Sequence, residues 1–299
     1  MGQHNKMQVI KPIYEFILWD NCLNNCKFCW QKQQNTFSTD EMRKKSVDLV
    51  IEFINSDNFE FGSHVLLVGG EIFDVKNDDV CNKIKELICF IIENMNQSKI
   101  DLFYINTNLL NINYDLLDFL LDKIRDNGFF NRLKFTTSYD KFGRFQTKEK
   151  ENEWFRNVKN IKDEYNELNI VINTILTKQF CDFEIKNDKS FVSDMSNRGF
   201  YVNLLPYVDI NSIYTVDRKT VFDVLLKTER HNRGYLKRYI DNFDLPQKKL
   251  IYRFKNTELI FSSSDYSECG HGINFRRYSD KNTCFICDLK TAFNGIIYG

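Results

Sequence analysis

Short apolar runs alternate with longer stretches of mixed polar and apolar residues along the first two thirds of the chain. The runs are rich in aromatic and β-branched residues, and several are too continuously apolar for a strand with one solvated face, so they predict strands that are buried on both faces. The expected strands are Ile13–Leu18, His64–Gly69, Ile100–Asn106, Leu133–Thr137, Ile170–Leu176 and Tyr201–Pro206. The stretches between them predict helices at Thr39–Asn55, Val80–Asn96, Tyr114–Asn127, Glu151–Tyr165 and Lys189–Arg198. The first of these helices has a clear start, because STDEM places a capping Ser38 or Thr39 before acidic residues.

This series of strands and helices predicts the fold class. Six strand–helix units in succession imply parallel strands joined by right-handed crossovers. Eight units would close a full barrel, so six predict an α/β fold in the form of a partial (β/α)6 TIM-like barrel. The pattern then changes: Asp217–Asp244 is typical of a charged helix, and LIYRFKNTELIFSSS predicts a hairpin that turns at Lys255–Thr257. We therefore expect a barrel core at residues 1–215 and a C-terminal helix, hairpin and cysteine-rich extension at residues 216–299.

Composition and charge narrow the functional classes. The 299 residues include 41 Lys and Arg against 41 Asp and Glu, so the formal net charge is zero, which disfavours general electrostatic capture of nucleic acid or anionic membrane. The stretch MGQHNKMQVIKPIYEF does not resemble a secretory signal, and no apolar run reaches the roughly 18 residues that a membrane-spanning helix needs. We expect a cytoplasmic protein that does not enter the membrane. In that compartment the nine cysteines stay reduced and serve metal ligation or packing rather than disulfides.

Three of the cysteines lie within eight residues of WDNCLNNCKFCWQ, directly after the first predicted strand. They are Cys22, Cys26 and Cys29, and barrel folds carry their chemistry at this end of a strand. Three thiolates can ligate three irons of a cubane cluster and leave the fourth iron open to an exogenous chelator. Zinc is the weaker interpretation, because a structural zinc ion takes four protein ligands. Packing as small apolar side chains is disfavoured by the many Asn, Lys and Gln residues nearby.

The spacing Cys22-x3-Cys26-x2-Cys29, with aromatic Phe28 before the last cysteine, resembles the signature of the radical S-adenosylmethionine superfamily. The resemblance implies that the three cysteines hold a [4Fe-4S] cluster whose fourth iron is chelated by the amine and carboxylate of S-adenosylmethionine. It also implies an electron donor such as flavodoxin or ferredoxin. Reduction of the cluster then cleaves the sulfonium to methionine and a 5′-deoxyadenosyl radical, which abstracts hydrogen from the substrate.

Later strand ends extend the resemblance over roughly residues 10–210. Gly69-Gly70-Glu71 resembles the family's GGE motif, which implies that Glu71 accepts a hydrogen bond from the methionyl amine, while the glycines permit a close approach. Asn106-Thr107-Asn108 lies where relatives carry Thr-Asn-Gly, with Asn108 in place of the glycine. The other expected cofactor contacts are Ser138, Asp140, Asn173, Leu205 and Pro206. Each of these polar residues is equally typical of a helix cap or a turn.

The extension contains a second set of possible ligands. SECGHGINFRRYSDKNTCFICDLK supplies Cys269-x-His271 and Cys284-x2-Cys287, a pattern typical of a four-ligand metal site. His271 favours structural zinc. The family resemblance favours an auxiliary iron–sulfur cluster held by the three cysteines, because a hairpin followed by three cysteines resembles the short SPASM or twitch tail of some members. Packing alone is disfavoured, since Cys-x2-Cys beside Gly and Asn is poor core material.

Three functional hypotheses stay open at this point. The short cluster-type tail favours modification of a peptide or protein. A nucleoside or tRNA substrate gripped by a zinc knuckle is the second, favoured by the basic and aromatic residues of RHNRGYLKRY and NFRRY and disfavoured by the neutral net charge. The third is a metal-binding scaffold without catalysis, against which the intact Cys22, Cys26, Cys29 and Glu71 argue.

Overall fold

A computed structural model of the chain describes residues 11–24, 26, 27, 29, 38–188, 190–206, 216–231, 248–255 and 258–266. Its strands are β1 (Ile13–Ile17), β2 (Ser63–Val68), β3 (Ile100–Thr107), β4 (Leu133–Tyr139), β5 (Ile170–Leu176), β6 (Tyr201–Pro206), β7 (Lys248–Lys255) and β8 (Glu258–Tyr266). Its helices are α1 (Asp40–Asn55), α2 (Asp78–Asn96), α3 (Tyr114–Asp126), α4 (Lys148–Glu164), α5 (Lys178–Lys186), α6 (Phe191–Asn197) and α7 (Arg218–His231), with a 3-10 turn η2 (Phe130–Arg132).

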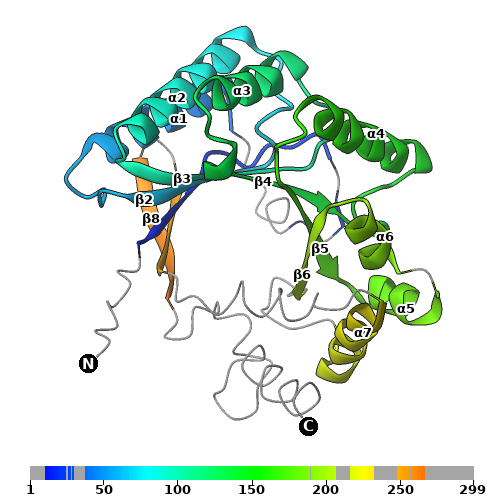
Figure 1. The fold of residues 1–299 in the computed structure, drawn as a ribbon. Coiled ribbons are helices and arrows are strands. Elements are labelled where there is room, and N and C mark those ends of the chain that lie inside the picture. The colour runs from blue at the N-terminus through cyan, green and yellow to red at the C-terminus, as the bar shows by residue number, and fades with distance from the viewer. Residues whose placement is uncertain are drawn as a thin grey trace, which may run out of the picture.

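The eight strands form one sheet in the order β6-β5-β4-β3-β2-β1-β7-β8. Each of the first five strands pairs in parallel with the next one along the chain, so each of these five connections crosses back over the sheet. The sheet curves like an open arch with α1 to α4 along its outer side, and β6 and β8 are its two edges among the described strands (Figure 1). The predicted α/β class is thus confirmed, as a mostly parallel sheet that does not close within the described residues.

The predicted strands agree closely with the structure, and none of the six differs by more than two residues at either end. The predicted hairpin is also present, because β7 and β8 pair antiparallel up to Lys255 and Glu258. Its place in the sheet was not predictable from a local pattern. β7 lies parallel to β1, with Ile13 opposite Lys249, so the last described strands extend the same sheet that carries the first.

Side-chain caps fix where the helices begin. Thr39 accepts a hydrogen bond from the Met42 N–H at the start of α1, as the sequence predicted. Thr147 does the same for α4, which therefore begins three residues before the predicted Glu151. α5 was not predicted at all, although Thr177 caps it by accepting from the Phe180 N–H. The predicted helix after Asp217 is observed as α7 up to His231.

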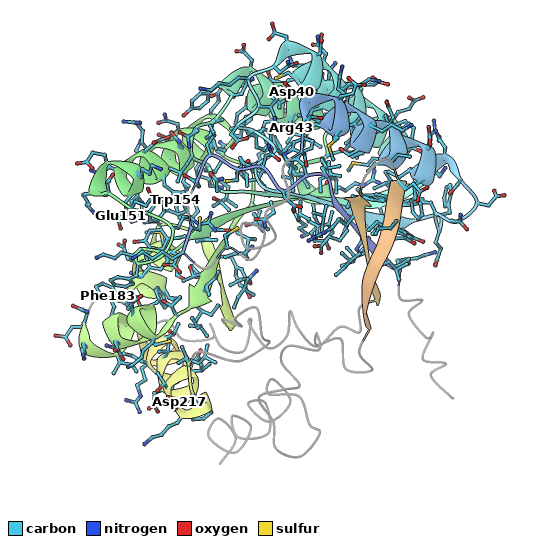
Figure 2. The ribbon with its side chains drawn as sticks, turned by 180° about the vertical axis from the view of Figure 1, so that it is seen from behind. Asp40, Arg43, Glu151, Trp154, Phe183 and Asp217 are labelled. Atoms are coloured by element: carbon cyan, nitrogen blue, oxygen red, sulfur yellow. The ribbon has the colours of Figure 1, made fainter. Side chains whose placement is uncertain are left out.

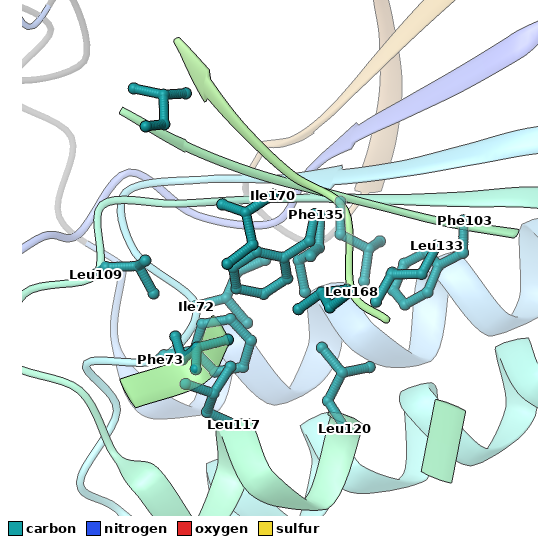
Figure 3. Close-up of a cluster of buried hydrophobic side chains, with 14 of the residues drawn as sticks. Ile72, Phe73, Phe103, Leu109, Leu117, Leu120, Leu133, Phe135, Leu168 and Ile170 are labelled. Atoms are coloured by element: carbon teal, nitrogen blue, oxygen red, sulfur yellow. The ribbon is translucent and has the colours of Figure 1, made fainter. Parts of the chain in front are cut away.

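The main core lies between the sheet and the outer helices. Side chains on alternate strand positions point to this side and are fully buried, among them Phe103 and Phe135, and they meet Leu117 and Leu120 of α3 (Figure 3). Burying one such Leu or Phe side chain contributes about 1.5–3 kcal/mol, so this layer is what holds the curved sheet to its helices. The other alternate positions face the inner side of the arch and are half-buried. Among the described helices, none is long and apolar enough to cross a membrane.

Candidate functional site

The cysteine loop, defined as residues 18–38 between β1 and α1, is bonded at its start to the segment that leaves β2. The Leu18 N–H donates to the Val68 carbonyl at 2.9 Å, and the Gly70 N–H donates to the Trp19 carbonyl at 2.7 Å. The Glu71 N–H then donates to the Asn21 carbonyl at 3.0 Å. These three bonds continue the β1–β2 pairing beyond the carboxyl ends of both strands, and they fix the backbone just before Cys22.

The two glycines of Gly69-Gly70-Glu71 are required by this contact. A Cβ atom on Gly70 would lie 1.7 Å from the Asn21 carbonyl oxygen, and one on Gly69 would lie 2.9 Å from the Trp19 carbonyl oxygen. Both distances are too short for real carbon–oxygen contacts. The close approach expected from the sequence is therefore made by the cysteine loop itself, whose backbone lies directly on the glycine pair.

Side chains that the sequence analysis did not single out secure the same loop. Asn21 donates to the Ser38 carbonyl at 3.0 Å and accepts from the Ser38 N–H at 2.8 Å, so it ties together the two ends of the loop. Asp74, which follows the glycine segment, accepts from the Leu23 N–H at 2.8 Å. Burial raises the pKa of Asp74, although the Leu23 N–H and the nearby Arg43 favour its ionised form.

The Trp19 ring anchors the loop to α1 and to Glu71. Its Nε1–H donates to the Glu71 carbonyl at 3.2 Å, and the Arg43 guanidinium lies 5.6 Å from the ring centroid. Figure 2 labels Arg43 together with Asp40 on the first turn of α1, where the two side chains form an ion pair at 3.4 Å. The sequence around Trp19 did not indicate that its side chain would anchor the cysteine loop.

The Glu71 carboxylate faces β3 and is fully engaged within the protein. Its Oε1 accepts from the Thr107 hydroxyl at 2.8 Å and from the Phe73 N–H at 3.1 Å, and its Oε2 accepts from the Asn108 N–H at 2.6 Å. Burial nevertheless raises the pKa of Glu71 to about 7. Its carboxylate therefore joins the ends of β2 and β3, and its expected role as acceptor of a cofactor amine stays a prediction.

The turn after β3 has its left-handed residue one position beyond Asn108. Asn108 was expected in the place of a glycine, but the left-handed backbone falls on Leu109, at φ +54°. A left-handed leucine is strained by about 1–2 kcal/mol. Its N–H donates to the Thr107 hydroxyl at 3.1 Å, and its side chain is completely buried. The left-handed residue of this turn therefore follows directly after the segment Asn106-Thr107-Asn108 singled out in the sequence.

The Cys22 sulfur lies at the junction of the cysteine loop with these two strand ends. It accepts from the Asn24 N–H and from the Asn108 side-chain amide, both at 3.4 Å. Burial, with Glu71 and Asp74 nearby, raises the pKa of Cys22 to about 12. Without a metal the side chain is thus a protonated thiol at neutral pH, and a metal ion that binds it must displace the proton.

Cys26 and Cys29 follow on the same loop. Cys26 is buried and Cys29 is half-buried, and the Cys29 N–H donates to the Cys26 carbonyl at 3.2 Å. The Lys27 N–H between them donates to the Gly143 carbonyl at 2.9 Å, which joins this part of the loop to the segment after β4. Phe28 lies outside the described residues.

Whether these residues suit an iron–sulfur cluster can be judged from the donors present. Within the described ranges no three His, Cys, Asp or Glu side chains gather closely enough to hold one metal ion. A cubane cluster makes a different demand, because each thiolate binds a separate iron and the sulfurs lie farther apart. The loop supplies three thiols, and the Asn24 side-chain NH2 group between Cys22 and Cys26 is buried without an acceptor among the described residues. The donor chemistry therefore fits the cluster.

The loop after β4 contacts the cysteine loop at Lys27. Asp140 accepts from the Phe142 and Gly143 N–H groups at 2.9 and 2.7 Å, so it holds the turn that meets the cysteine loop. Its second oxygen is buried and accepts no hydrogen bond from the described residues, and burial raises its pKa. From α4, Lys150 reaches the Asn24 side-chain oxygen at 3.5 Å.

Polar side chains line the inner face of the sheet on the strands that follow. Thr136 donates to Asn106 at 3.1 Å, and Asn203 donates to Asn173 at 3.1 Å. Ser138 lies opposite Asn173 in the β4–β5 register and so faces the same side. Thr136 and Asn203 were not predicted as site residues, although the two-residue alternation of a strand would have placed them on this face.

Leu205 is half-buried on β6 opposite Ile175, and Pro206 ends that strand opposite Leu176. The structure thus brings Cys22, Gly70, Glu71 and Thr107 together through Asn108 and the loop backbone, while Asn173 and Leu205 lie farther across the sheet on β5 and β6. The proposed ligands of the extension, Cys269, His271, Cys284 and Cys287, lie outside the described residues.

A separate cleft of about 550 Å³ opens between the end of β4 and helices α5 and α6. Tyr139, Phe180 and Phe191 form its apolar wall, and the Lys141 ammonium lies 4.6 Å from the centroid of the Phe183 ring, which is labelled in Figure 2. None of the residues that the sequence predicted for the site lines this cleft.

Neither the protein-family models nor the curated proteins include a match to the chain.

Proposed function

We propose that the protein is a radical S-adenosylmethionine enzyme whose Cys22, Cys26 and Cys29 hold a [4Fe-4S] cluster on a partial (β/α)6 TIM-like barrel. Once bound and reduced by a donor such as flavodoxin or ferredoxin, the cluster would supply reductive cleavage of S-adenosylmethionine and a 5′-deoxyadenosyl radical. A peptide or protein is the proposed substrate. The pattern of Cys269, His271, Cys284 and Cys287 is proposed as a second metal site, for zinc or for an auxiliary cluster.

One observation carries the proposal. The loop with the three cysteines, the glycine pair after β2 and the Thr107–Asn108 turn after β3 are joined by direct hydrogen bonds at the carboxyl edge of a parallel sheet. In parallel α/β folds this edge is where ligands bind. Three separate motifs of the resemblance therefore meet around the sulfur atom of half-buried Cys22.

The protein's own residues have defined tasks in this proposal. The glycine pair lets the cysteine loop lie on the end of β2, and Glu71 holds the ends of β2 and β3 at a fixed spacing. The polar side chains of Asn106, Ser138 and Asn173 offer hydrogen bonds to a polar ligand on the inner face. The unsatisfied oxygen of Asp140 and the Asn24 amide are groups that a bound ligand could satisfy.

Anaerobic reconstitution of the full chain with iron and sulfide tests the ligand assignment. We expect about four irons per chain at the loop, beyond any held by the extension. Cys26→Ala should lose this cluster, whereas Cys89→Ala, which removes an exposed cysteine of α2, should retain it. Reduction in the presence of S-adenosylmethionine should then yield 5′-deoxyadenosine. A Cys26→Ala chain with a full complement of iron would refute the assignment.

A further inference from the structure

Asn108 is held by hydrogen bonds on two sides, and these determine where its side-chain amide points. Its N–H donates to Glu71 at 2.6 Å, and its side-chain oxygen accepts from the Leu110 N–H at 2.8 Å. Because an oxygen must face the Leu110 N–H, the side-chain NH2 group is assigned to the opposite side. That group lies 3.4 Å from the Cys22 sulfur. Asn108 is 5% exposed and Cys22 is half-buried, so the contact is partly shielded from water.

Leu109, the next residue, has a strained backbone that helps to fix this orientation of Asn108. Leu109 adopts a left-handed backbone that leucine rarely takes, and the Thr107 hydroxyl and the buried Leu109 side chain hold it there. The turn places the Leu110 N–H against the Asn108 oxygen. The strained turn therefore fixes the Asn108 side chain so that its N–H group donates to the Cys22 sulfur.

Two N–H donors on the one sulfur of half-buried Cys22 suit a metal-bound thiolate better than a thiol. A thiol sulfur is a weak acceptor, whereas an anionic sulfur accepts strong, charge-assisted hydrogen bonds. The second donor on Cys22 is the Asn24 backbone N–H, also at 3.4 Å. Hydrogen bonds to ligand sulfurs are among the factors that set the reduction potential of an iron–sulfur cluster, because they stabilise the more negative, reduced state.

We propose that Asn108 is a positioning residue for Cys22, and that its side-chain amide raises the midpoint potential of the cluster by donating a hydrogen bond to the ligand sulfur. This inference rests on the proposed function, since it needs a cluster at Cys22. It assigns Asn108 a role toward the cysteine ligand, whereas the sequence analysis gave it no role beyond the turn.

The test is a redox titration of the reconstituted full chain, followed by electron paramagnetic resonance of the reduced cluster. Asn108→Leu removes the donor at similar side-chain size and should shift the midpoint to more negative potential at an unchanged iron content. Asn94→Leu is the matched control, because Asn94 is equally buried but bonds the Phe90 carbonyl within α2. Its midpoint should equal that of the unsubstituted chain.

A second variant covers the case in which Asn108→Leu does not load the cluster. Asn108→Asp keeps the shape and the acceptor for the Leu110 N–H and replaces the donor by an oxygen, so it should shift the midpoint in the same direction. An unchanged midpoint in a loaded variant overturns the inference while the proposed function stands. If the unsubstituted chain itself binds no cluster, both are overturned.

Discussion

Gly70→Ala provides the sharpest test of how the cysteine loop is built. Gly70 does not have a left-handed backbone, so an alanine there would ordinarily stabilise the fold by about 0.4–1 kcal/mol through the unfolded state. In this structure the added Cβ would lie 1.7 Å from the Asn21 oxygen and 2.2 Å from its carbonyl carbon. Both are backbone atoms, so no side-chain rotation can relieve the overlap, and the loop must move away by about an ångström or more.

The movement breaks defined hydrogen bonds, which sets the expected magnitude. The bonds from the Gly70 N–H to Trp19 and from the Glu71 N–H to Asn21 are 2.7 and 3.0 Å long. Leaving buried partners of this kind unsatisfied costs about 1–3 kcal/mol each. We therefore expect Gly70→Ala to lower the free energy of unfolding by about 2–4 kcal/mol, together with a loss of bound iron.

Urea unfolding followed by tryptophan fluorescence measures the first quantity, and iron analysis after reconstitution measures the second. Gly128→Ala is the control, because Gly128 has φ +67° and no atom within 4 Å of the added Cβ. It should cost only about 1–2 kcal/mol of backbone strain and leave iron binding intact. If Gly70→Ala is as stable as the unsubstituted chain and binds the same iron, the loop does not lie on the glycine pair.

Three further predictions follow from buried contacts. The pKa of Glu71 is about 7 in the folded protein and ordinarily 4.5, so its contribution to the free energy of unfolding is full below pH 4.5 and is lost as the pH rises through 7, by about 3 kcal/mol. Urea unfolding at several pH values in this range measures the loss. Glu71→Gln should remove it, and an unchanged dependence of the free energy of unfolding on pH would contradict this prediction. Trp154→Ala removes a fully buried ring and its 3.1 Å bond to Thr137, so it should cost about 3–5 kcal/mol in the same assay, and a cost below about 1 kcal/mol would argue against this packing. Asn21→Ala removes both bonds to Ser38, so amide exchange at Ser38 should accelerate; equal exchange rates would mean that the clamp does not form in solution.

Much of the fold was predictable because its signals are local. Continuous apolar runs marked β1 to β6, and side-chain caps such as Thr39 marked helix starts. α5 escaped prediction because Lys178–Lys186 is short and carries no long apolar repeat, so only its Thr177 cap gave a signal. The pairing of β7 with β1 depends on contacts between residues far apart in the sequence, which no local pattern encodes.

The candidate site divides in the same way. The rule that parallel strands present their carboxyl ends at one edge correctly placed Cys22 near Gly70 and Thr107. The contacts that hold them there come from residue types with many uses, such as Asn21 and Asp74, and these became recognisable only once their partners were known. The inward direction of the Glu71 carboxylate was equally hidden, because it depends on the Thr107 hydroxyl and the Asn108 N–H.

The position of β1 has a consequence for how the protein matures. β1 carries the cysteine loop, yet one of its two neighbours is β7, in which Lys249 pairs with Ile13. During synthesis one side of β1 therefore keeps its N–H and C=O groups unpaired until β7 has left the ribosome. If the cysteine loop holds the proposed cluster, iron delivered earlier would meet thiols that are not yet held in place, so loading would have to follow completion of the sheet.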